Sequence, residues 1–209
     1  MPTKPKLNQP ETPDNVQQRD SFQTPNYATE LLIPFIPKNI STIWECACGD
    51  YKISKKLESA GYSVISTDLK YGTNFLESKI VNLENTAIVT NPPYSLKQKF
   101  YRKCREYNIP FALLIPCDYC GWIIEALQNG AEKIIPTRRI DYITPNCISR
   151  INNRENTKYE SVAEIDPEHL KKDAKKSASQ FHSMWLTWGF NLGKSETFVE
   201  LTKEMKQNI

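Results

Sequence analysis

The sequence lacks the hydrophobic segments that mark membrane-embedded and secreted proteins. No apolar run approaches the roughly 20 residues that a membrane-spanning helix needs. Residues 1–20 are polar and proline-rich, without the hydrophobic region of a signal peptide. Six cysteines in a chain without a secretory signal are expected to be reduced thiols. We therefore expect a cytoplasmic protein without a membrane-spanning segment.

Histidine is also scarce, with only two in the chain. Two close cysteine pairs, Cys46 with Cys48 and Cys117 with Cys120, offer the other residues that a metal would use. However, Cys46 and Cys117 each follow a segment that resembles a buried strand, and free cysteine is among the most buried residue types. The thiols are therefore expected in the core, and no metal site is expected.

Neither sign of charge dominates, because 27 Lys and Arg are balanced by 24 Asp and Glu, for a formal net charge of +3. A mildly basic chain is compatible with a nucleic-acid partner but does not argue for one. The length of 209 residues and the hydrophobic fraction of 39% suit a single globular domain. We expect a disordered tail at residues 1–20, where hydrophobic residues are nearly absent, and one ordered domain at residues 21–209.

Segments with strand and helix patterns alternate through the first two thirds of the chain. Strands are predicted at residues 41–45, 62–67, 87–90, 111–116, 133–136 and 181–190, and helices at residues 25–35, 52–60, 96–107 and 122–127. Thr24 is expected to cap the first helix, with Pro25 at its first helical position. The alternation predicts an α/β fold with a mostly parallel sheet that is covered on both faces.

Residues 146–176 interrupt this alternation. They include seven Lys and Arg and six Asp and Glu, and the span is too long for an ordinary connection. We expect a charged loop inserted into the single domain. The helix at residues 96–107 is basic, which fits either a solvated surface or a helix that faces phosphates. These two segments are the ones available for recognising a substrate.

The run Asn91, Pro92, Pro93 and Tyr94 directly follows the expected strand at residues 87–90. The two prolines fix the backbone and remove two donors, which leaves the amide and the loop carbonyls as acceptors beside an aromatic ring. Oriented acceptors beside a ring suit a planar heterocycle with an exocyclic amine, and open α/β sheets bind ligands at the carboxyl ends of strands. A simple turn that ends a strand fits these four residues equally well.

Asp68 is a second candidate, because it ends the expected strand at residues 62–67. It follows Glu45 by 23 residues, close to the spacing at which an acid meets a ribose hydroxyl in nucleotide-binding units. The loop after the first strand is poor in glycine, however, with Gly49 alone. Any βαβ unit can end a strand in Asp, so a nucleotide site and a plain strand end both stay open.

Taken in order, these motifs resemble the amino-group (N6-adenine) DNA methyltransferases, and among them the short phage and prophage members. The resemblance covers residues 22–190 and rests on Phe22-Gln-Thr-Pro, Trp44-Glu-Cys-Ala-Cys-Gly, Ser66-Thr-Asp, Asn74-Phe75 and, most specifically, Asn91-Pro-Pro-Tyr. It implies the class I S-adenosylmethionine-dependent methyltransferase fold, which is Rossmann-like. This fold has a mostly parallel seven-stranded sheet with one antiparallel strand near the C-terminus, which would be residues 181–190.

The resemblance also implies a role for each matched residue. The residues implied to bind the cofactor S-adenosylmethionine are Phe22, Thr24, Pro25, Glu45, Ala47, Gly49, Asp68, Asn74 and Phe75. Within this set, Asp68 would hold the ribose hydroxyls, and Asn74 and Phe75 would contact the cofactor adenine. The implied catalytic loop comprises Asn91, Pro92, Pro93 and Tyr94.

The implied reaction transfers a methyl group to the exocyclic N6 amine of adenine in DNA. The Asn91 side-chain oxygen and the Pro92 carbonyl would accept the two N–H bonds of the amine, which stabilises positive charge as it develops. Tyr94 would stack on the base after the base is flipped out of the duplex. Neither a metal nor a covalent intermediate is required.

Other substrates and roles remain open for the same residues. An adenine of RNA or a glutamine amide of a protein would satisfy the same acceptors, and a degenerate module that only binds nucleic acid or a partner would retain them. Tyr51 favours the degenerate module, because the family most often has a second glycine there and a bulky ring would crowd the cofactor unless it points outward. Because the chain has no separate recognition domain, a partner subunit that supplies target recognition is a further expectation.

Overall fold

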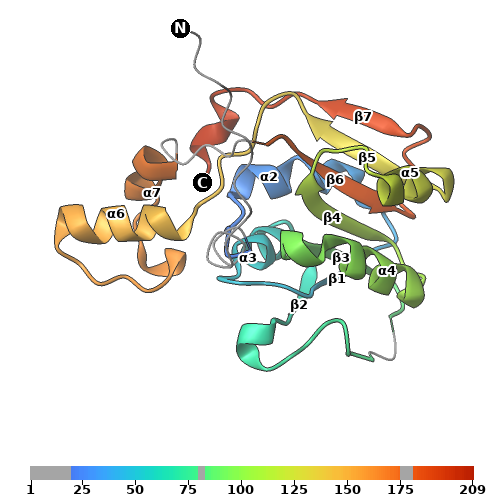
Figure 1. Ribbon diagram of the computed structural model, residues 1–209, viewed down its shortest axis with the longest axis horizontal. Helices are drawn as coiled ribbons and strands as arrows, with labels where there is room; N and C mark the ends of the chain where they lie inside the picture. Colours follow the sequence, from blue (N-terminus) through green and yellow to red (C-terminus); the bar gives the residue numbers. More distant parts are fainter. Residues whose placement is uncertain (1–19, 80–82, 175–180) are drawn as a thin grey trace, which may run out of the picture.

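The computed structural model describes residues 20–79, 83–174 and 181–209, and its centre is a seven-stranded sheet in the order β2-β1-β3-β4-β6-β5-β7 (Figure 1). The strands are β1 Thr42–Glu45, β2 Ser63–Ser66, β3 Thr86–Thr90, β4 Phe111–Pro116, β5 Ala131–Pro136, β6 Ser183–Trp188 and β7 Glu196–Val199. β6 runs antiparallel to β4 and β5, and the other described pairs are parallel. The prediction of a mostly parallel α/β sheet with one antiparallel strand near the C-terminus is confirmed.

Helices and short 3-10 turns connect these strands. The α-helices are α2 Asn26–Glu30, α3 Lys52–Ser59, α4 Lys97–Tyr107, α5 Gly121–Gln128, α6 Pro145–Glu155 and α7 Pro167–Ala174. The 3-10 turns are η1 Ile33–Phe35, η2 Leu69–Tyr71, η3 Tyr94–Leu96, η4 Val162–Glu164 and η6 Met205–Gln207. Helices α3, α4 and α5 confirm three of the predicted helices to within two residues.

Each face of the sheet has its own hydrophobic core, because successive strand residues point to opposite faces. One core joins strand residues to buried residues of α2 and α3, and its members include Tyr27, Ile43, Leu57, Val89 and Leu114. The other core joins strand residues to α4 and α5, and its members include Trp44, Ile88, Phe100, Leu113 and Ile123. The central strands are therefore buried on both sides, as expected for parallel strands covered by helices.

The first helix is shorter than the sequence predicts. α2 ends at Glu30 and η1 follows, because Pro34 lacks the N–H that a continuing α-helix would need. Thr24 does not cap the helix: Pro25 holds the N-cap position, without a side-chain hydrogen bond. Proline has no backbone N–H, and the first N–H groups of a helix have no partner within the helix. Pro25 is therefore tolerated at the N-cap as well as at the first helical position, where the sequence predicts it.

The predicted charged loop at residues 146–176 is wrong, because α6, η4 and α7 fill most of this span. Cys147 and Ile151 lie one turn apart on α6 and are fully buried against the first core. Asp173 is also buried, and its carboxylate pairs with Arg154. Part of the charge in this span therefore forms an internal ion pair. Because charged residues outnumber apolar ones here, the helical spacing of the apolar residues is hard to recognise in the sequence.

The predicted tail at residues 1–20 lies outside the described residues, except for Asp20. The Asp20 carboxylate accepts hydrogen bonds from the backbone N–H and the hydroxyl of Ser95, so the chain is fixed beside η3 at this point. Residues 175 and 176, at the end of the predicted loop, also lie outside the described part. Of the helices that the structure describes, none has the length and apolarity needed to cross a membrane.

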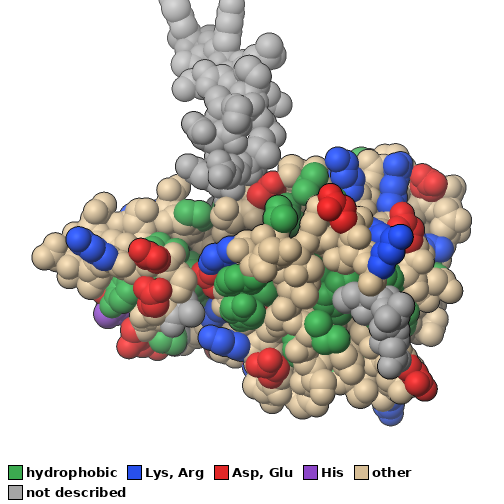
Figure 2. Space-filling model, turned by 90° about the horizontal axis from the view of Figure 1, so that it is seen from below, with side chains coloured by type: hydrophobic (Ala, Val, Ile, Leu, Met, Phe, Trp, Pro, Cys, Tyr) green, Lys and Arg blue, Asp and Glu red, His purple; other side chains and the backbone are tan. Residues whose placement is uncertain are grey.

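Strand β2 and turn η2 form one margin of the molecule, at the bottom of Figure 1. Ile65, Leu69 and Tyr71 of these elements are exposed. Figure 2 views the molecule from this side and shows hydrophobic side chains near the middle, with charges of both signs around them. Charge alone therefore does not mark this face as a surface for nucleic acid.

Candidate active site

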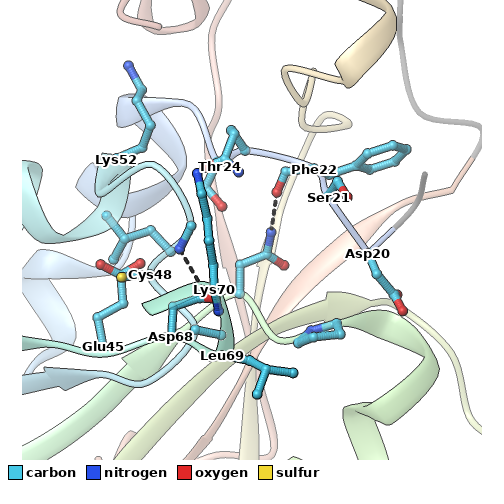
Figure 3. Close-up of a pocket in the computed structure, with 16 residues that line it drawn as sticks. Asp20, Ser21, Phe22, Thr24, Glu45, Cys48, Lys52, Asp68, Leu69 and Lys70 are labelled. Atoms are coloured by element: carbon cyan, nitrogen blue, oxygen red, sulfur yellow. Dashed lines mark hydrogen bonds between the residues drawn. The ribbon is translucent and has the colours of Figure 1, made fainter. Parts of the chain in front are cut away.

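The carboxyl ends of β1 and β3 lie side by side, because the two strands are parallel neighbours. The chain passes from β1 to β2 on one side, whereas β3 lies on the other side of β1. This reversal of strand order is the switch point at which open α/β sheets bind ligands. A cavity of about 490 Å³ opens there, a volume typical of small-molecule sites (Figure 3).

The cavity brings together eight of the thirteen site residues that the sequence predicts. They come from the segment before α2, the loop after β1, the end of β2 and the loop after β3. The eight are Phe22, Thr24, Glu45, Ala47, Gly49, Asp68, Asn91 and Pro93. Figure 3 shows Glu45 and Asp68 on one side of the cavity and Phe22 on the other. Residues far apart in the sequence thus converge on one volume.

Asn91 follows β3 directly and holds one polar atom without a partner. Its Nδ2 donates a hydrogen bond of 3.2 Å to the backbone carbonyl of Phe22. Because a carbonyl oxygen can only accept, this bond determines which end of the amide is nitrogen. The Oδ1 atom is buried and receives no hydrogen bond from the described residues. Such orphaned acceptors are rare in folded proteins, so Asn91 keeps an oriented acceptor at the edge of the cavity.

Glu45 ends β1 and is only 1% exposed. Burial raises the pKa of its carboxyl to about 8, because surroundings of low dielectric disfavour the charged form. The carboxyl accepts a hydrogen bond from the hydroxyl of Ser54 on α3, and the hydroxyl oxygens of Ser54 and Ser66 lie 2.6 Å apart. At neutral pH Glu45 therefore presents a mostly uncharged carboxyl to the cavity.

Asp68 ties the ends of β1 and β2 together. Its Oδ2 accepts the N–H of Gly49 at 2.9 Å, and its Oδ1 accepts the N–H of Lys70 at 2.8 Å. Each carboxylate oxygen has a further lone pair, so Asp68 can also accept from hydroxyls of a ligand. Gly49 has a φ of +49°, and a Cβ there would lie 2.8 Å from the Gln23 side chain. Glycine at this crossing of the two segments avoids both the strain of a left-handed backbone and the contact with the Gln23 side chain.

Five predicted site residues do not line the cavity, namely Pro25, Asn74, Phe75, Pro92 and Tyr94. Phe75 is 2% exposed, and its ring centroid lies 5.1 Å from that of Trp44 and 4.9 Å from that of Phe100. The Asn74 side chain accepts the N–H of Leu76 at 3.1 Å. In this conformation Asn74 and Phe75 hold the chain after η2 against the second core.

Tyr94 lies within an aromatic group beside the cavity. Its ring centroid is 6.3 Å from that of Tyr142 and 5.4 Å from that of Phe181, with both pairs edge-on. Burial raises the pKa of the Tyr94 hydroxyl well above its usual value. The hydroxyl of Tyr142 donates to that of Ser183 at 2.9 Å. A planar ligand can stack on Tyr94 only after these rings rearrange.

The sequence did not single out the other eight residues that line the cavity, which are Asp20, Ser21, Gln23, Cys48, Lys52, Ile53, Leu69 and Lys70. Four of them are direct neighbours of predicted residues, namely Ser21, Gln23, Cys48 and Leu69. Asp20 and Lys70 lie two residues from a predicted residue, so a wider reading of each motif would have found these six. Lys52 and Ile53 come from the first turn of α3, beyond the motif that ends at Gly49. Burial lowers the pKa of Lys52, and Figure 3 shows its side chain directed away from Asp68.

Tyr51 lies outside the cavity. Its ring stacks on that of Tyr71, with centroids 5.3 Å apart and an angle of 20° between the planes. Its backbone is left-handed, with a φ of +61°, which a bulky side chain seldom adopts. Position 51 thus has a backbone conformation that favours glycine. Tyr51 adopts this conformation, and its side chain does not enter the cavity.

The cysteines divide between core and surface. Cys46 and Cys48 are buried, as expected, whereas Cys120 is exposed. Burial raises the pKa of Cys48 to about 12, so this thiol stays protonated at neutral pH. Within the described residues, no group of three or more His, Cys, Asp or Glu is placed to hold a metal ion.

No protein-family model matches this chain, and no curated protein matches it either. The geometry by itself defines the class: an α/β protein whose mostly parallel seven-stranded sheet is compatible with a Rossmann-like fold, with a ligand cavity at its switch point. The chemistry of the cavity residues is therefore the basis for a function.

Proposed function

We propose that this protein is a class I methyltransferase that moves a methyl group from S-adenosylmethionine to the exocyclic N6 amine of adenine in DNA. The observation that carries the proposal is the free Oδ1 acceptor of Asn91 beside the cavity. An exocyclic amine is the donor that complements this acceptor. The two prolines that follow Asn91 add no competing backbone N–H.

The cavity residues fit S-adenosylmethionine. Asp68 keeps lone pairs for the ribose hydroxyls, and Gly49 and Ala47 leave room for the methionine end beside Glu45. The volume of about 490 Å³ suits a ligand of this size. When bound, S-adenosylmethionine supplies an electrophilic methyl group carried on positively charged sulfur.

Asn91 would act on the substrate amine. The lone pair of this amine is delocalised into the ring, which makes it a poor nucleophile. An N–H bond donated to Oδ1, with a second donated to the Pro92 carbonyl, favours a pyramidal nitrogen whose lone pair is available. The Phe22 carbonyl already fixes the amide, so little reorganisation is needed as positive charge develops. An amide is not a base, so the proton released from the methylated nitrogen passes to solvent.

Access to Asn91 requires movement. Oδ1 has almost no exposed surface, and the ring of Tyr94 is packed against Phe181. Flipping a base out of a duplex costs a few kcal/mol. Stacking on an aromatic ring returns about 1–3 kcal/mol. Opening of the aromatic group and insertion of the base would therefore be coupled.

The α6–α7 segment is a candidate for target recognition, because it contacts the loop that borders the cavity. The N–H of Val162 donates to the Asp50 carboxylate at 3.0 Å. Asp50 also pairs with Lys70 at 3.3 Å, and Lys70 lines the cavity. A partner subunit that recognises the target is the other arrangement.

The proposal is tested with purified protein and S-adenosylmethionine labelled in its methyl group. The label is expected on N6 of adenine in DNA. Label on RNA adenine, or on a glutamine of a protein, would reassign the substrate, because those groups fit the same acceptor. Failure to bind the cofactor in calorimetry would contradict the methyltransferase and favour a degenerate binding module.

We predict that Tyr51→Gly binds S-adenosylmethionine within about twofold of the wild type, because the lost ring lies outside the cavity. Relief of left-handed strain, about 1 kcal/mol or more, offsets the loss of stacking, about 0.5–1.5 kcal/mol. The thermal midpoint should therefore change little. Calorimetry and thermal melting check both statements.

The matched control is Gly49→Ala, which places a methyl group on the Gln23 side chain at a left-handed position. Moving Gln23 aside would break the hydrogen bond that its Oε1 accepts from the N–H of Asp50 at 3.0 Å. Gly49→Ala should weaken cofactor binding at least tenfold. Equal losses in the two variants would mean that Tyr51 takes part in the site.

A further inference from the structure

A second groove lies between α4 and α5, which cover the same face of the sheet (Figure 1). It has a volume of about 230 Å³ and is separate from the cavity at the switch point, with no lining residue in common. Arg102 and Arg105 of α4 line it together with Trp122 of α5. Glu125 is the one carboxylate among the described residues that line it.

The positive charges of α4 differ in how they are used. Lys97 pairs with Asp118 at 3.0 Å, and Lys103 pairs with Glu106 at 3.0 Å. Arg102 is exposed, and no described acceptor lies within hydrogen-bond or ion-pair reach of its guanidinium. Arg102 therefore brings to the groove a positive charge that forms no ion pair with the described residues.

Arg105 adds a second guanidinium that is held in place. It donates to the backbone carbonyl of Asn129 at 3.1 Å and lies over the Trp188 ring, 4.3 Å from the centroid. Its Nε atom is buried without a hydrogen-bond partner among the described residues. A guanidinium held in this way loses little side-chain entropy when its remaining N–H groups bind an anion.

We propose that this groove binds a phosphodiester of the nucleic-acid strand that carries the target adenine, an inference that rests on the proposed function. Guanidinium groups recognise phosphate oxygens through directed, charge-assisted hydrogen bonds. Turn η3, which begins at Tyr94, directly precedes α4, and Arg102 lies in the second turn of that helix. The groove would therefore hold a phosphate a few nucleotides from the target base.

The test measures binding of a fluorescein-labelled 20-nucleotide DNA, as single strand and as duplex, by anisotropy at several salt concentrations. Arg102→Ala removes one phosphate contact. The slope of log affinity against log salt should then fall by about 0.9 for the duplex, or about 0.7 for the single strand. This change in slope means that Arg102→Ala should bind DNA about five- to tenfold more weakly than the wild type near 0.1 M salt. The form of DNA that shows the change identifies the strand that the groove holds.

Two further variants serve as controls. Lys55→Ala removes one charge from the exposed side of α3, on the opposite face of the sheet, and should leave the slope unchanged. Glu125→Gln removes the carboxylate from the groove and should tighten DNA binding two- to threefold. Opposite effects at Arg102 and Glu125 are not produced by a general loss of folding.

The outcomes separate this inference from the proposed function. Arg102-dependent DNA binding without methyl transfer would support the groove and contradict the methyltransferase. Adenine methylation by the wild type, together with an unchanged salt slope in Arg102→Ala, would support the methyltransferase and contradict the groove. Absence of DNA binding by the wild type would overturn the groove assignment. Poly-glutamate bound as tightly as DNA, and equally dependent on Arg102, would assign the groove to an acidic protein partner instead.

Discussion

Asn91→Ala is expected to lower the rate of methyl transfer to adenine by about 10²–10³-fold, the cost of losing one preorganised polar group at a reacting centre. Cofactor affinity should change less than threefold, because Glu45 and Asp68 remain in place across the cavity. Single-turnover kinetics with labelled cofactor measure the rate, and calorimetry measures the affinity. A variant that keeps the wild-type rate would remove Asn91 from the reaction.

The same substitution should not destabilise the fold. Wild-type Asn91 buries Oδ1 without a donor, and an unsatisfied buried polar atom costs about 1–3 kcal/mol. Alanine removes that atom but also the hydrogen bond to the Phe22 carbonyl. The two effects oppose each other, so the free energy of unfolding should stay equal or rise slightly. A residue kept for packing would show the opposite, a clear loss of stability with little loss of rate.

Asn91→Asp is the matched comparison. It keeps an acceptor oxygen at the same distance from the backbone but cannot donate to the Phe22 carbonyl. If the anchored orientation matters, this variant should be slower than the wild type and faster than Asn91→Ala. Equal rates for Asp and Asn would mean that the acceptor alone is sufficient.

The part of the site built on strand ends could be predicted from the sequence. β1 and β3 are short apolar runs, and residues that directly follow parallel strands meet at one edge of the sheet. Glu45, Asp68 and Asn91 line one cavity for this reason. Their proposed roles in binding and transfer depend on chemistry and not on position alone, and the variants of Asn91 and Glu45 test two of these roles.

The rest depends on tertiary packing that motif order does not specify. Phe75 belongs to a motif, yet three aromatic neighbours draw it into the core. α6 carries so many polar residues that its spacing of apolar residues is weak, and the burial of Asp173 that pairs its arginines is a tertiary event. Tyr51 shows a third case, because only the backbone reveals that the position is left-handed. Such features follow from contacts between segments distant in sequence.

Glu45→Gln is expected to change how stability depends on pH, by about 4 kcal/mol between pH 4 and pH 8. The buried carboxyl has a pKa raised to about 8, whereas an unfolded glutamate ionises with its ordinary pKa of 4.5. Between these values the unfolded chain has lost a proton that the folded protein keeps. Raising the pH therefore favours unfolding, at about 1.4 kcal/mol per pH unit. Above pH 8 the folded carboxyl also ionises, and the slope disappears.

The glutamine side chain of this variant is a neutral isostere of the protonated carboxyl. Glu45→Gln and the wild type should therefore be equally stable at pH 4 and below, where the unfolded carboxyl is also mostly protonated. At pH 8 the variant should be the more stable protein, because it has no carboxyl to ionise on unfolding. Urea unfolding at several pH values measures the difference, in which the contributions of all other groups cancel. Glu125→Gln, at an exposed glutamate of α5, should show no such change. Parallel pH profiles for wild type and Glu45→Gln would mean that the carboxyl is charged at neutral pH.

The protonation state of Glu45 also bears on the cavity itself. A neutral carboxyl beside Ser54 and Ser66 offers hydrogen bonds, whereas a carboxylate would offer charge to a cationic ligand. A positively charged cofactor favours the ionised form, so its binding should release a proton near pH 7. Calorimetry in buffers of different ionisation enthalpy would detect this proton in the wild type and not in Glu45→Gln. Proton release that is equal in both proteins would place the titrating group elsewhere, for example on the ligand.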